Sequence, residues 1–481
     1  MVPAAQISNP KLMPASRYDF SVREGKLFFE GVDLSSLAVR HGSPLFVFSE
    51  RMITDSVERV RKAFGARFQK FRLFYATKAG SNVTVLRTIR RQGLGAEVSS
   101  EGDIFVSLMA GFSPRAIVFN GPAKSDRELT ISCRLGLHCV NLDSMDELER
   151  LHAICKREGK TARVAFRVRP DVGAGTKLIQ TGTAKSKFGL GLTEIVDAYA
   201  KAVSFHDYIK VTGIHAHVGS QNTSIESWSA FVKKLASLTV KLKEELNLDI
   251  KELNIGGGVP AVHVTDSLNQ PTPPFTDRVP SDEEVAGAVA DALKEGGVSD
   301  IELAIEPGRR IVAGAALLVT KVITEKASGG ESWIYVDAGF NTLPSSSMPW
   351  YYHMVPATKA DVKALSPYRV AGPLCDNKDV FHDVHGEDEG NPTLPEHRML
   401  PEGIRPGDYL ALLDVGAYNM DIQDSFNERM MAGGIYIDRH GRANIMRKRQ
   451  SYEDLLAYEP HSKRSAKRVV RLMVDDQTHD A

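Results

Sequence analysis

Apolar residues in this chain gather in short runs, most of them within residues 45–310. The runs are rich in β-branched and aromatic residues, a composition typical of buried strands. In order they are LFYATK (73–78), GAEVSS (95–100), AIVFNGPAK (116–124), HCVNLDS (138–144), RVAFRVRP (163–170), KVTGIHAHVGS (210–220), KELNIGGG (251–258) and IELAIEPGRR (301–310). Segments with helical apolar spacing separate them, such as SNVTVLRTIRRQG, SMDELERLHAICKREG and SWSAFVKKLASLTVKLKEEL. In the second segment Ser144 and Glu147 have the spacing of a capping box, which predicts that a helix begins there.

This alternation predicts the fold of the central region. Eight strands that alternate with helices are what a (β/α)8 barrel requires, so we expect an α/β TIM barrel over residues 45–310. An open, doubly wound sheet uses the same alternation and is the alternative. The count of eight and the absence of a GxGxxG motif at the first turn favour the barrel.

Polar residues and glycines stand at or just after the C-terminal ends of these runs. They are Lys78, Glu97, Asn120, Asp143, Arg167, His217, the glycines at 256–258 and Glu306. Barrel enzymes place their reactive groups at this end of the strands. The pattern therefore predicts an enzyme whose active site is built at the mouth of the barrel.

The flanking segments have a different pattern. Residues 17–40 contain two short strand-like runs around REGK, which predicts a hairpin. From about residue 312 onward, short strand-like runs alternate with glycine-rich turns, as in an antiparallel β-domain. We therefore expect N-terminal strands (1–44) that join the β-domain, a cofactor-binding barrel (45–310) and a C-terminal β-domain (311–481).

Composition narrows the class of protein. At 481 residues the chain is long enough for two or three domains. Its 60 Lys and Arg residues balance 60 Asp and Glu residues, so no net field favours binding to nucleic acid or to an anionic membrane. The four cysteines form no CxxC motif, the N-terminus lacks the layout of a signal peptide, and no run of about 18 apolar residues is present. We expect a soluble cytoplasmic enzyme that binds neither nucleic acid nor membrane.

Lys78 lies where the first of the eight runs meets a turn. A lysine in that place is most often a solvated strand end. The alternative role is chemical, because a desolvated lysine forms a Schiff base with an aldehyde such as pyridoxal phosphate. That cofactor needs three more elements: a phosphate cradle, a partner for the pyridine nitrogen and a group against the ring face.

Each of these elements has a candidate at a strand end. The glycines of NIGGGVP, among them Gly257 and Gly258, let backbone amides approach a phosphate, although such glycines also close ordinary turns. Glu306 in AIEPGRR is placed to pair with the pyridine nitrogen, although Pro-Gly is common in surface turns. His217 and Ser220 in IHAHVGSQ are placed to stack on the ring and to bind phosphate, although a histidine in a strand is usually structural.

Together and in this order, the motifs are typical of one group of enzymes. The chain resembles the alanine-racemase-fold (type III) pyridoxal phosphate decarboxylases, the group that contains the diaminopimelate, ornithine and lysine decarboxylases. The resemblance covers nearly the whole chain and is carried by LFVFSE, YATK, GAEVSS, NLDS, SKFGL, HVGSQ, IGGG, EPGR, PLCDNKDVF and DVGAYN. It implies pyridoxal 5'-phosphate as cofactor, a small amino acid as substrate and a homodimer with shared active sites.

The same resemblance implies a role for each matched residue. Lys78 looks like the Schiff-base lysine, His217 like the residue that stacks on the ring and Glu306 like the partner of the pyridine nitrogen. Cys375 looks like the acid that reprotonates the carbanion and is donated across the dimer interface. Arg309 matches the family's ligand for the substrate carboxylate. The implied phosphate contacts are Ser220, Gly257, Gly258, Gly308 and Tyr418.

Three positions depart from the pattern of the diaminopimelate decarboxylases. Members of that group carry an Arg and a Tyr four residues apart after the VDAG-type strand, where this chain has Ser345 and Pro349. They carry Glu after the matching Cys, where this chain has Asp376. A distal carboxylate on the substrate would lack its bidentate partner here. The segments CDNKD, SSS…W and SYEDLLAYE look closer to the branch that acts on D-ornithine and D-lysine. The implied substrate contacts are Arg309, Asp376 and Tyr418.

Three alternatives stay open. The substrate can be a larger amino acid, conjugated to a carrier or a siderophore. The chain can be a non-catalytic relative that binds without turnover, although all of its reactive positions are retained. A racemase on the same barrel would need a tyrosine as second acid–base group on the opposite ring face, and Cys375 within PLCDNKDVF favours decarboxylation instead.

Overall fold

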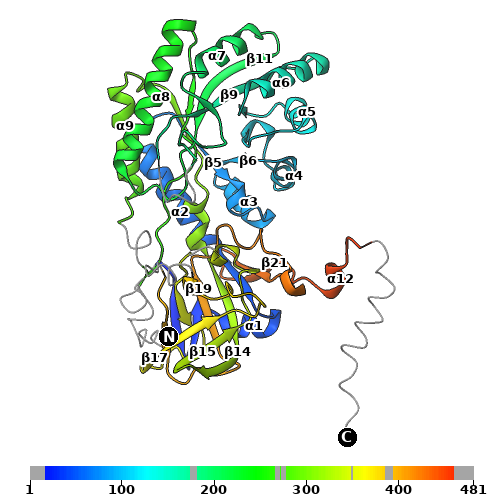
Figure 1. Ribbon diagram of the computed structural model, residues 1–481, viewed down its shortest axis with the longest axis vertical. Helices are drawn as coiled ribbons and strands as arrows, with labels where there is room; N and C mark the ends of the chain where they lie inside the picture. Colours follow the sequence, from blue (N-terminus) through cyan, green and yellow to red (C-terminus); the bar gives the residue numbers. More distant parts are fainter. Residues whose placement is uncertain are drawn as a thin grey trace. The chain divides into compact units, whose positions relative to one another are not determined.

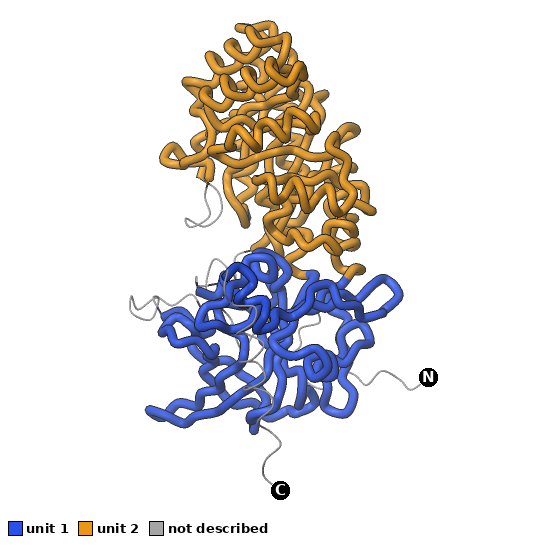
Figure 2. Tube along the Cα trace, turned by 90° about the vertical axis from the view of Figure 1, so that its right-hand side faces the viewer, with its two compact units in different colours: residues 1–49, 263–276, 315–481 blue, residues 50–262, 277–314 orange. Residues whose placement is uncertain are grey.

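The computed structural model describes residues 17–173, 181–265, 271, 278–347, 350–384 and 394–459. The chain forms two compact units (Figure 2). Unit 1 comprises residues 1–49, 263–276 and 315–481, and unit 2 comprises residues 50–262 and 277–314. Unit 1 therefore draws on three separate stretches of sequence.

Unit 2 contains a closed barrel of parallel strands. The pairings of β13 with β5 and of β8 with β9 close the circle. The eight strands are β5 (Phe71–Ala76), β6 (Gly95–Val98), β7 (Ile117–Phe119), β8 (Cys139–Leu142), β9 (Ala162–Arg169), β11 (Ile209–Ala216), β12 (Glu252–Asn254) and β13 (Glu302–Ile305). A two-residue strand, β10 (Leu190–Gly191), adds a further pairing to β9. The predicted (β/α)8 barrel is confirmed, with one strand from each of the eight apolar runs.

Helices alternate with these strands along the chain (Figure 1). They are α2 (Glu50–Gly65), α3 (Val83–Arg91), α4 (Glu101–Met109), α5 (Asp126–Leu135), α6 (Met145–Glu158), α7 (Ile195–Ser204), α8 (Ile225–Leu246), α9 (Asp282–Glu295) and the short α10 (Arg309–Val312). The Ser144 hydroxyl caps α6 by accepting from the Glu147 amide at 3.2 Å. The Glu147 carboxylate accepts from the Asp143 amide and from Lys124 instead of completing the capping box. No helix in the described part of the chain is long and apolar enough to cross a membrane.

One cluster of buried apolar side chains draws on five strands of the barrel. It consists of Phe74, Val118, Cys139, Ala165 and Ala304. Gly95 on β6 makes room for the Phe74 ring, because a Cβ at that position would lie 2.4 Å from it. Close packing of this kind holds the strand ends in fixed positions.

Unit 1 contains a nine-stranded sheet. Its strands are β4 (Leu45–Ser49), β14 (Ala316–Ser328), β15 (Glu331–Val336), β16 (Met354–Pro356), β17 (Leu365–Ala371), β18 (Arg398–Pro401), β19 (Tyr409–Leu413), β20 (Gly433–Ile437) and β21 (Ala443–Arg447). Most neighbours are antiparallel, but β15 pairs with β17 and β4 pairs with β20 in parallel. The predicted β-rich domain is present, and its sheet is mixed where an antiparallel one was expected.

The N-terminal residues form a small sheet of their own within unit 1. β1 (Phe20–Arg23) and β2 (Lys26–Phe29) make the predicted hairpin, and β3 (Val32–Asp33) and α1 (Leu34–His41) follow. Both turn residues of the hairpin have positive φ, 50° and 71°, as a two-residue type I′ turn requires. The strand that joins the larger sheet is β4, which pairs with β14 and β20. The boundaries 1–44, 45–310 and 311–481 stay a prediction, and the compact units differ from them at β4 and at residues 263–276.

Candidate active site

Lys78 lies just beyond the C-terminal end of β5, in the single 3₁₀ turn η1 (Thr77–Ala79). Its Nζ donates to Oε2 of Glu97 at 2.5 Å. Glu97 lies on the adjacent strand β6, and its side chain is fully buried, whereas the Lys78 side chain is 46% exposed. The Thr77 hydroxyl donates to the Glu97 carbonyl at 2.9 Å, which ties the two strand ends together. Lys78 is therefore held at the barrel mouth with its amine still accessible.

Glu306 follows β13 and is a carboxylate with three side-chain hydrogen-bond partners at the mouth. It accepts from Asn254 Nδ2 at 2.8 Å and from Asn120 Nδ2 at 3.0 Å, and His215 Nε2 lies 3.4 Å away. Burial alone would raise the pKa of this carboxyl, but His215, followed by Lys78 and Asn120, holds the pKa below its ordinary value. Glu306 is therefore a buried carboxylate that stays ionised at neutral pH.

His217 follows β11 and lies beside the glycine loop after β12, since a Cβ on Gly256 would lie 2.8 Å from the His217 Cβ. Burial first, and then the nearby cations Arg167 and Lys78, lower the pKa of His217 to about 3. The imidazole is therefore neutral at neutral pH. Its buried Nδ1 has no hydrogen-bond partner among the described residues. A neutral aromatic ring of this kind can lie against a flat ligand without charge repulsion.

The glycines at residues 256–258 and 308 let segments of backbone approach one another closely. A Cβ on Gly257 would lie 2.5 Å from the Glu306 carbonyl oxygen, and one on Gly258 would lie 2.3 Å from the Gly219 carbonyl oxygen. Gly258 also has a φ of +107°, which L side chains rarely adopt. These positions therefore require glycine, and the loops present a backbone surface without side chains.

Ser220 and Gly308 extend this surface. Arg309 Nε donates to the Ser220 hydroxyl at 3.3 Å, which links the loop after β11 to the start of α10. A Cβ on Gly308 would lie 2.9 Å from the Ala76 Cβ, at the end of the strand that leads to Lys78. The structure therefore brings eight predicted site residues to one end of unit 2. They are Lys78, His217, Ser220, Gly257, Gly258, Glu306, Gly308 and Arg309.

The other predicted site residues, Cys375, Asp376 and Tyr418, belong to unit 1. Cys375 and Asp376 are exposed on a loop between β17 and β18. Cys375 is anchored by its backbone amide, which donates to Asn427 Oδ1 at 2.8 Å. The buried carboxylate of Asp379 organises the loop by accepting from the amides of Leu374 and Phe340 at 2.7 Å and 2.9 Å.

Tyr418 follows β19 and has a φ of +57°, a left-handed conformation that is uncommon for a tyrosine. Its carbonyl oxygen lies 3.4 Å from the hydroxyl of Ser345, which is buried. A neutral hydroxyl therefore occupies the position where the resemblance implies an arginine. Pro349, the second departure, lies outside the described residues.

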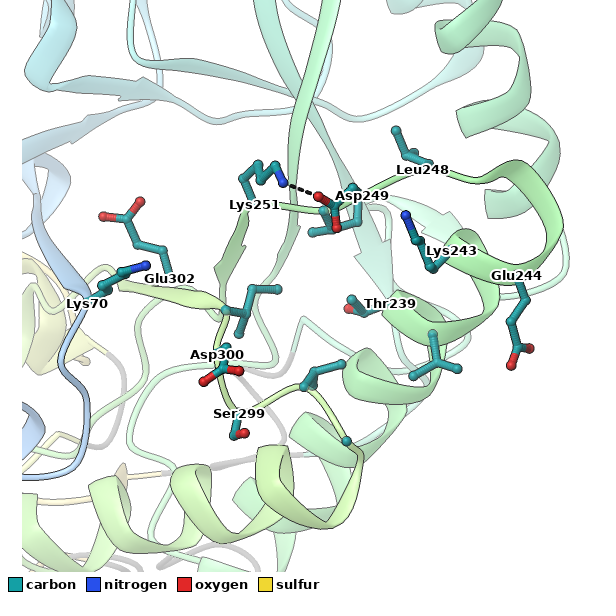
Figure 3. Close-up of a pocket in the computed structure, with 15 residues that line it drawn as sticks. Lys70, Thr239, Lys243, Glu244, Leu248, Asp249, Lys251, Ser299, Asp300 and Glu302 are labelled. Atoms are coloured by element: carbon teal, nitrogen blue, oxygen red, sulfur yellow. Dashed lines mark hydrogen bonds and ion pairs between the residues drawn. The ribbon is translucent and has the colours of Figure 1, made fainter.

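A separate pocket of about 660 Å³ opens at the other end of the barrel strands (Figure 3). It lies around the starts of β12 and β13 and the C-terminal half of α8. Its charged lining residues are Lys70, Lys243, Glu244, Asp249, Lys251, Asp300 and Glu302. None of the predicted site residues lines it, so the reactive groups and this pocket are at opposite ends of the barrel.

Comparison with known proteins identifies the family. The family model "pyridoxal-dependent decarboxylase, pyridoxal binding domain" matches residues 51–313. The diaminopimelate decarboxylase of Aquifex aeolicus is 33% identical over 434 residues, which are 90% of this chain and 95% of that protein. That of Methanocaldococcus jannaschii is 31% identical over 464 residues, 94% of this chain and 99% of that protein. The chain belongs to the pyridoxal-dependent decarboxylases.

A solved structure supports the same assignment over both units. The crystal structure of the M. jannaschii diaminopimelate decarboxylase in complex with L-lysine has a TM-score of 0.81 and 30% identity, and covers 92% of this chain and 97% of that one. The resemblance inferred from the motifs is thereby confirmed. The cofactor of this decarboxylase is pyridoxal phosphate.

The residues at the barrel mouth of this decarboxylase fit that cofactor. An accessible amine, an ionised buried carboxylate and a neutral imidazole meet the needs of its aldehyde, its pyridine nitrogen and its ring. The side-chain-free backbone at Gly257, Gly258 and Gly308 suits an anionic phosphate.

Sequence reasoning missed the residues that hold these groups in place. Glu97 and Asn120 were noted only as polar residues at strand ends, and Asn254 and His215 received no role. The signal available in the sequence was their position, since each lies within a strand or directly after one at the C-terminal end. Their partners could not be read from spacing, because these depend on how the barrel closes.

Proposed function

We propose that this decarboxylase acts on a basic amino acid with a distal amine, D-ornithine or D-lysine ahead of meso-diaminopimelate. Its chemistry as a cofactor-dependent decarboxylase is supported by the continuous hydrogen-bonded link from Lys78 through Glu97 and Asn120 to Glu306, beside a backbone surface that only glycine permits. Such an arrangement serves a cofactor that is held by an amine at one point and by a carboxylate at another.

Each of these residues then has a task. Lys78 would bind the cofactor covalently, Glu306 would keep the pyridine nitrogen protonated, and His217 would lie against the ring. Ser220, Gly257, Gly258, Gly308 and Tyr418 would bind the phosphate. When bound, pyridoxal phosphate supplies the sink for the electron pair that departing CO₂ leaves behind. The residues at the barrel mouth would hold the departing carboxyl group of the substrate in a fixed position, so that positioning would contribute to the rate.

The proton for Cα comes from Cys375 in this proposal. Its thiol is exposed, and an S–H group can serve as a general acid. We propose that Cys375 and Asp376 complete the active site of a partner subunit, so that the active form is a homodimer with two-fold symmetry. We further propose a cytoplasmic enzyme, because all four cysteines are unpaired thiols, as in a reducing compartment.

Substrate choice rests on three residues. Arg309 would bind a carboxylate of the substrate, and Asp376 would pair with the distal ammonium group. A charge-assisted contact of that kind contributes about 1.5–3 kcal/mol, or roughly ten- to a hundredfold in specificity. Ser345 offers no positive charge for a distal carboxylate, which is the reason that meso-diaminopimelate ranks lower.

Meso-diaminopimelate is the second candidate because of the relatives. Proteins named diaminopimelate decarboxylase match at 31–33% identity over at least nine-tenths of this chain. Their common name supports this substrate, whereas Ser345 argues against it.

The test is a CO₂-release assay with purified protein and added pyridoxal phosphate. The panel consists of L- and D-lysine, L- and D-ornithine, arginine and meso-diaminopimelate. We expect the highest kcat/KM for D-ornithine or D-lysine. If meso-diaminopimelate is the best substrate, the interpretation of Ser345 is wrong.

Two further outcomes of the assay carry information. If the protein binds the cofactor but nothing on the panel reacts, a larger conjugated substrate or a non-catalytic binding role becomes the better interpretation. If the protein shows no absorbance band at about 420 nm, the wavelength of a lysine-linked cofactor, the proposal fails.

A further inference from the structure

Asn120, just after β7, lies between two buried carboxylates at the barrel mouth. Its Nδ2 donates to Glu97 Oε1 at 3.0 Å and to Glu306 Oε2 at 3.0 Å. Glu97 is the residue that holds Lys78, and both carboxylates are at most 4% exposed. One amide group therefore satisfies acceptors on two strands that are not adjacent, β6 and the end of β13.

The amide can serve both carboxylates in only one orientation. Asn141 Nδ2 donates to Asn120 Oδ1 at 2.5 Å, and Asn141 Oδ1 accepts from the Cys139 thiol at 3.4 Å. If the Asn120 amide were reversed, its oxygen would face two carboxylates and its NH₂ would face another NH₂. The chain of donors that starts at Cys139 therefore fixes both Nδ2 hydrogens toward the carboxylates.

We propose that Asn120 is a positioning residue that couples Glu97 to Glu306, the proposed partner of the pyridine nitrogen. The inference rests on the proposed function of this site. It adds that Asn120 controls the charge of the two carboxylates. Two carboxylates that share a site raise one another's pKa, and one of them tends to take up a proton. A neutral amide with two donors avoids this, because it stabilises both ionised forms and adds no charge.

Other charged or titratable groups also face this pair of carboxylates, and any pH effect includes them. From the surrounding strands and turns they are Lys78, Cys139, Arg167, His215 and His217. Lys78 is the most direct reporter, because its amine contacts Glu97 at 2.5 Å. The basicity of Lys78 should therefore follow the charge that Asn120 maintains.

The experiment measures how fast acetic anhydride acylates Lys78 in the full-length protein without cofactor, as a function of pH, by mass spectrometry. Only the unprotonated amine reacts, so the midpoint pH reports the basicity of Lys78. Asn120→Asp places a third carboxyl between the two carboxylates. Because like charges this close favour uptake of one proton, the total negative charge stays the same, and the midpoint should move by less than about 0.3 unit. Asn120→Leu removes both donors, so that one carboxylate takes up a proton, and should lower the midpoint.

Asn254→Leu is the matched control, because Asn254 donates to Glu306 and its side-chain hydrogen bonds within the described part of the chain do not include Glu97. It should move the midpoint by less than about 0.3 unit. The inference is overturned if Asn120→Leu raises the midpoint, if it moves the midpoint no further than the control does, or if Asn120→Asp lowers the midpoint as much as Asn120→Leu. If circular dichroism shows that Asn120→Leu is unfolded, Asn120→Ala, which also removes both donors, takes its place. A wild-type protein without the absorbance band would overturn the proposed function and leave this measurement intact.

Discussion

The barrel mouth and the loop at residues 373–379 hold their polar side chains in opposite ways. At the mouth, Glu97 and Glu306 are almost fully buried, and each has several hydrogen-bond partners on neighbouring strand ends. On the loop, Cys375 and Asp376 are exposed, and the loop is organised by the single buried carboxylate of Asp379.

This difference predicts how substitutions in the two regions affect the reaction. A network of mutually supporting contacts fixes the groups proposed for the cofactor, so a change there affects many partners. The groups proposed for the proton and the substrate stand on one loop, where a substitution affects few neighbours. We therefore expect large, uniform losses from changes at the mouth and smaller, separable losses from changes on the loop.

The largest effect is expected for Lys78→Ala. It should abolish the absorbance band at about 420 nm and lower CO₂ release by at least about three orders of magnitude, because the covalent attachment point of the cofactor is lost. Lys70→Ala is the matched control, since Lys70 lines the pocket at the other end of the barrel. It should leave both readouts unchanged. A normal band in Lys78→Ala would show that another residue holds the cofactor.

Cys375→Ala should follow, with a loss in kcat of about 10²–10⁴-fold, the range that a positioned proton donor contributes. The absorbance band should remain, because the barrel holds the groups assigned to the cofactor. A loss of the band together with activity would contradict the separation of the two regions.

The same variant tests whether active sites are shared between subunits. After subunit exchange between Lys78→Ala and Cys375→Ala chains, a mixed dimer would contain one intact site, so about a quarter of the wild-type activity should return. Each variant incubated alone is the control. If exchange is verified by mass and no activity returns, each site is built from one chain.

The fold was predictable because its signal is local and repeated. Each of the eight strands came from a run whose composition and spacing are visible in the sequence. The mixed character of the second sheet was not predictable in this way. It arises from two parallel pairs, β15 with β17 and β4 with β20. β4, at residues 45–49, and β20, at residues 433–437, contain nothing that specifies a partner so far along the chain.

The residues of the candidate site likewise differ in whether the sequence alone predicts their role. Lys78, His217 and Glu306 stand in motifs whose residue types indicate their chemistry. Asn120 donates to residues 23 and 186 positions away, and that relation exists only when the barrel closes. The half-formed capping box of α6 has a similar cause, since the Glu147 carboxylate finds a stronger partner in the buried Lys124.

Asp379→Asn tests the loop through its pH dependence. Burial first, with help from Asp376, raises the pKa of Asp379 from 3.8 to about 6. Between these values the folded state binds a proton that the unfolded state does not. This contribution to the free energy of unfolding is therefore complete below pH 4 and is lost as pH rises through 6, by about 3 kcal/mol.

Urea unfolding of the wild type and the variant between about pH 4 and pH 7 measures this difference. The advantage of the wild type over Asp379→Asn should shrink as pH rises. Asp438→Asn is the matched control of opposite sign, because hydrogen bonds lower the pKa of Asp438 to about 2. Its contribution is present above pH 4 and is lost only as pH falls below that value, so the Asp438→Asn difference should stay constant between about pH 4 and pH 7. An Asp379 difference that does not vary with pH would show that the carboxylate is ionised throughout.

The smallest effect is expected for Asp376→Asn, which sharpens the assignment of the loop to the substrate. The amide keeps an oxygen for the Lys378 backbone N–H, which donates to Asp376 Oδ1 at 2.9 Å, so the loop should keep its conformation. Loss of the negative charge should lower kcat/KM for D-ornithine and D-lysine by about ten- to a hundredfold, mainly through KM. Norleucine, which lacks the distal amine, should be a poor substrate for both proteins and show no such change. Asp361→Asn removes an exposed charge elsewhere in unit 1 and should leave both substrates unaffected. If Asp376→Asn lowers turnover of norleucine as much as that of D-lysine, Asp376 acts on the loop or on the proton transfer and not on the distal amine.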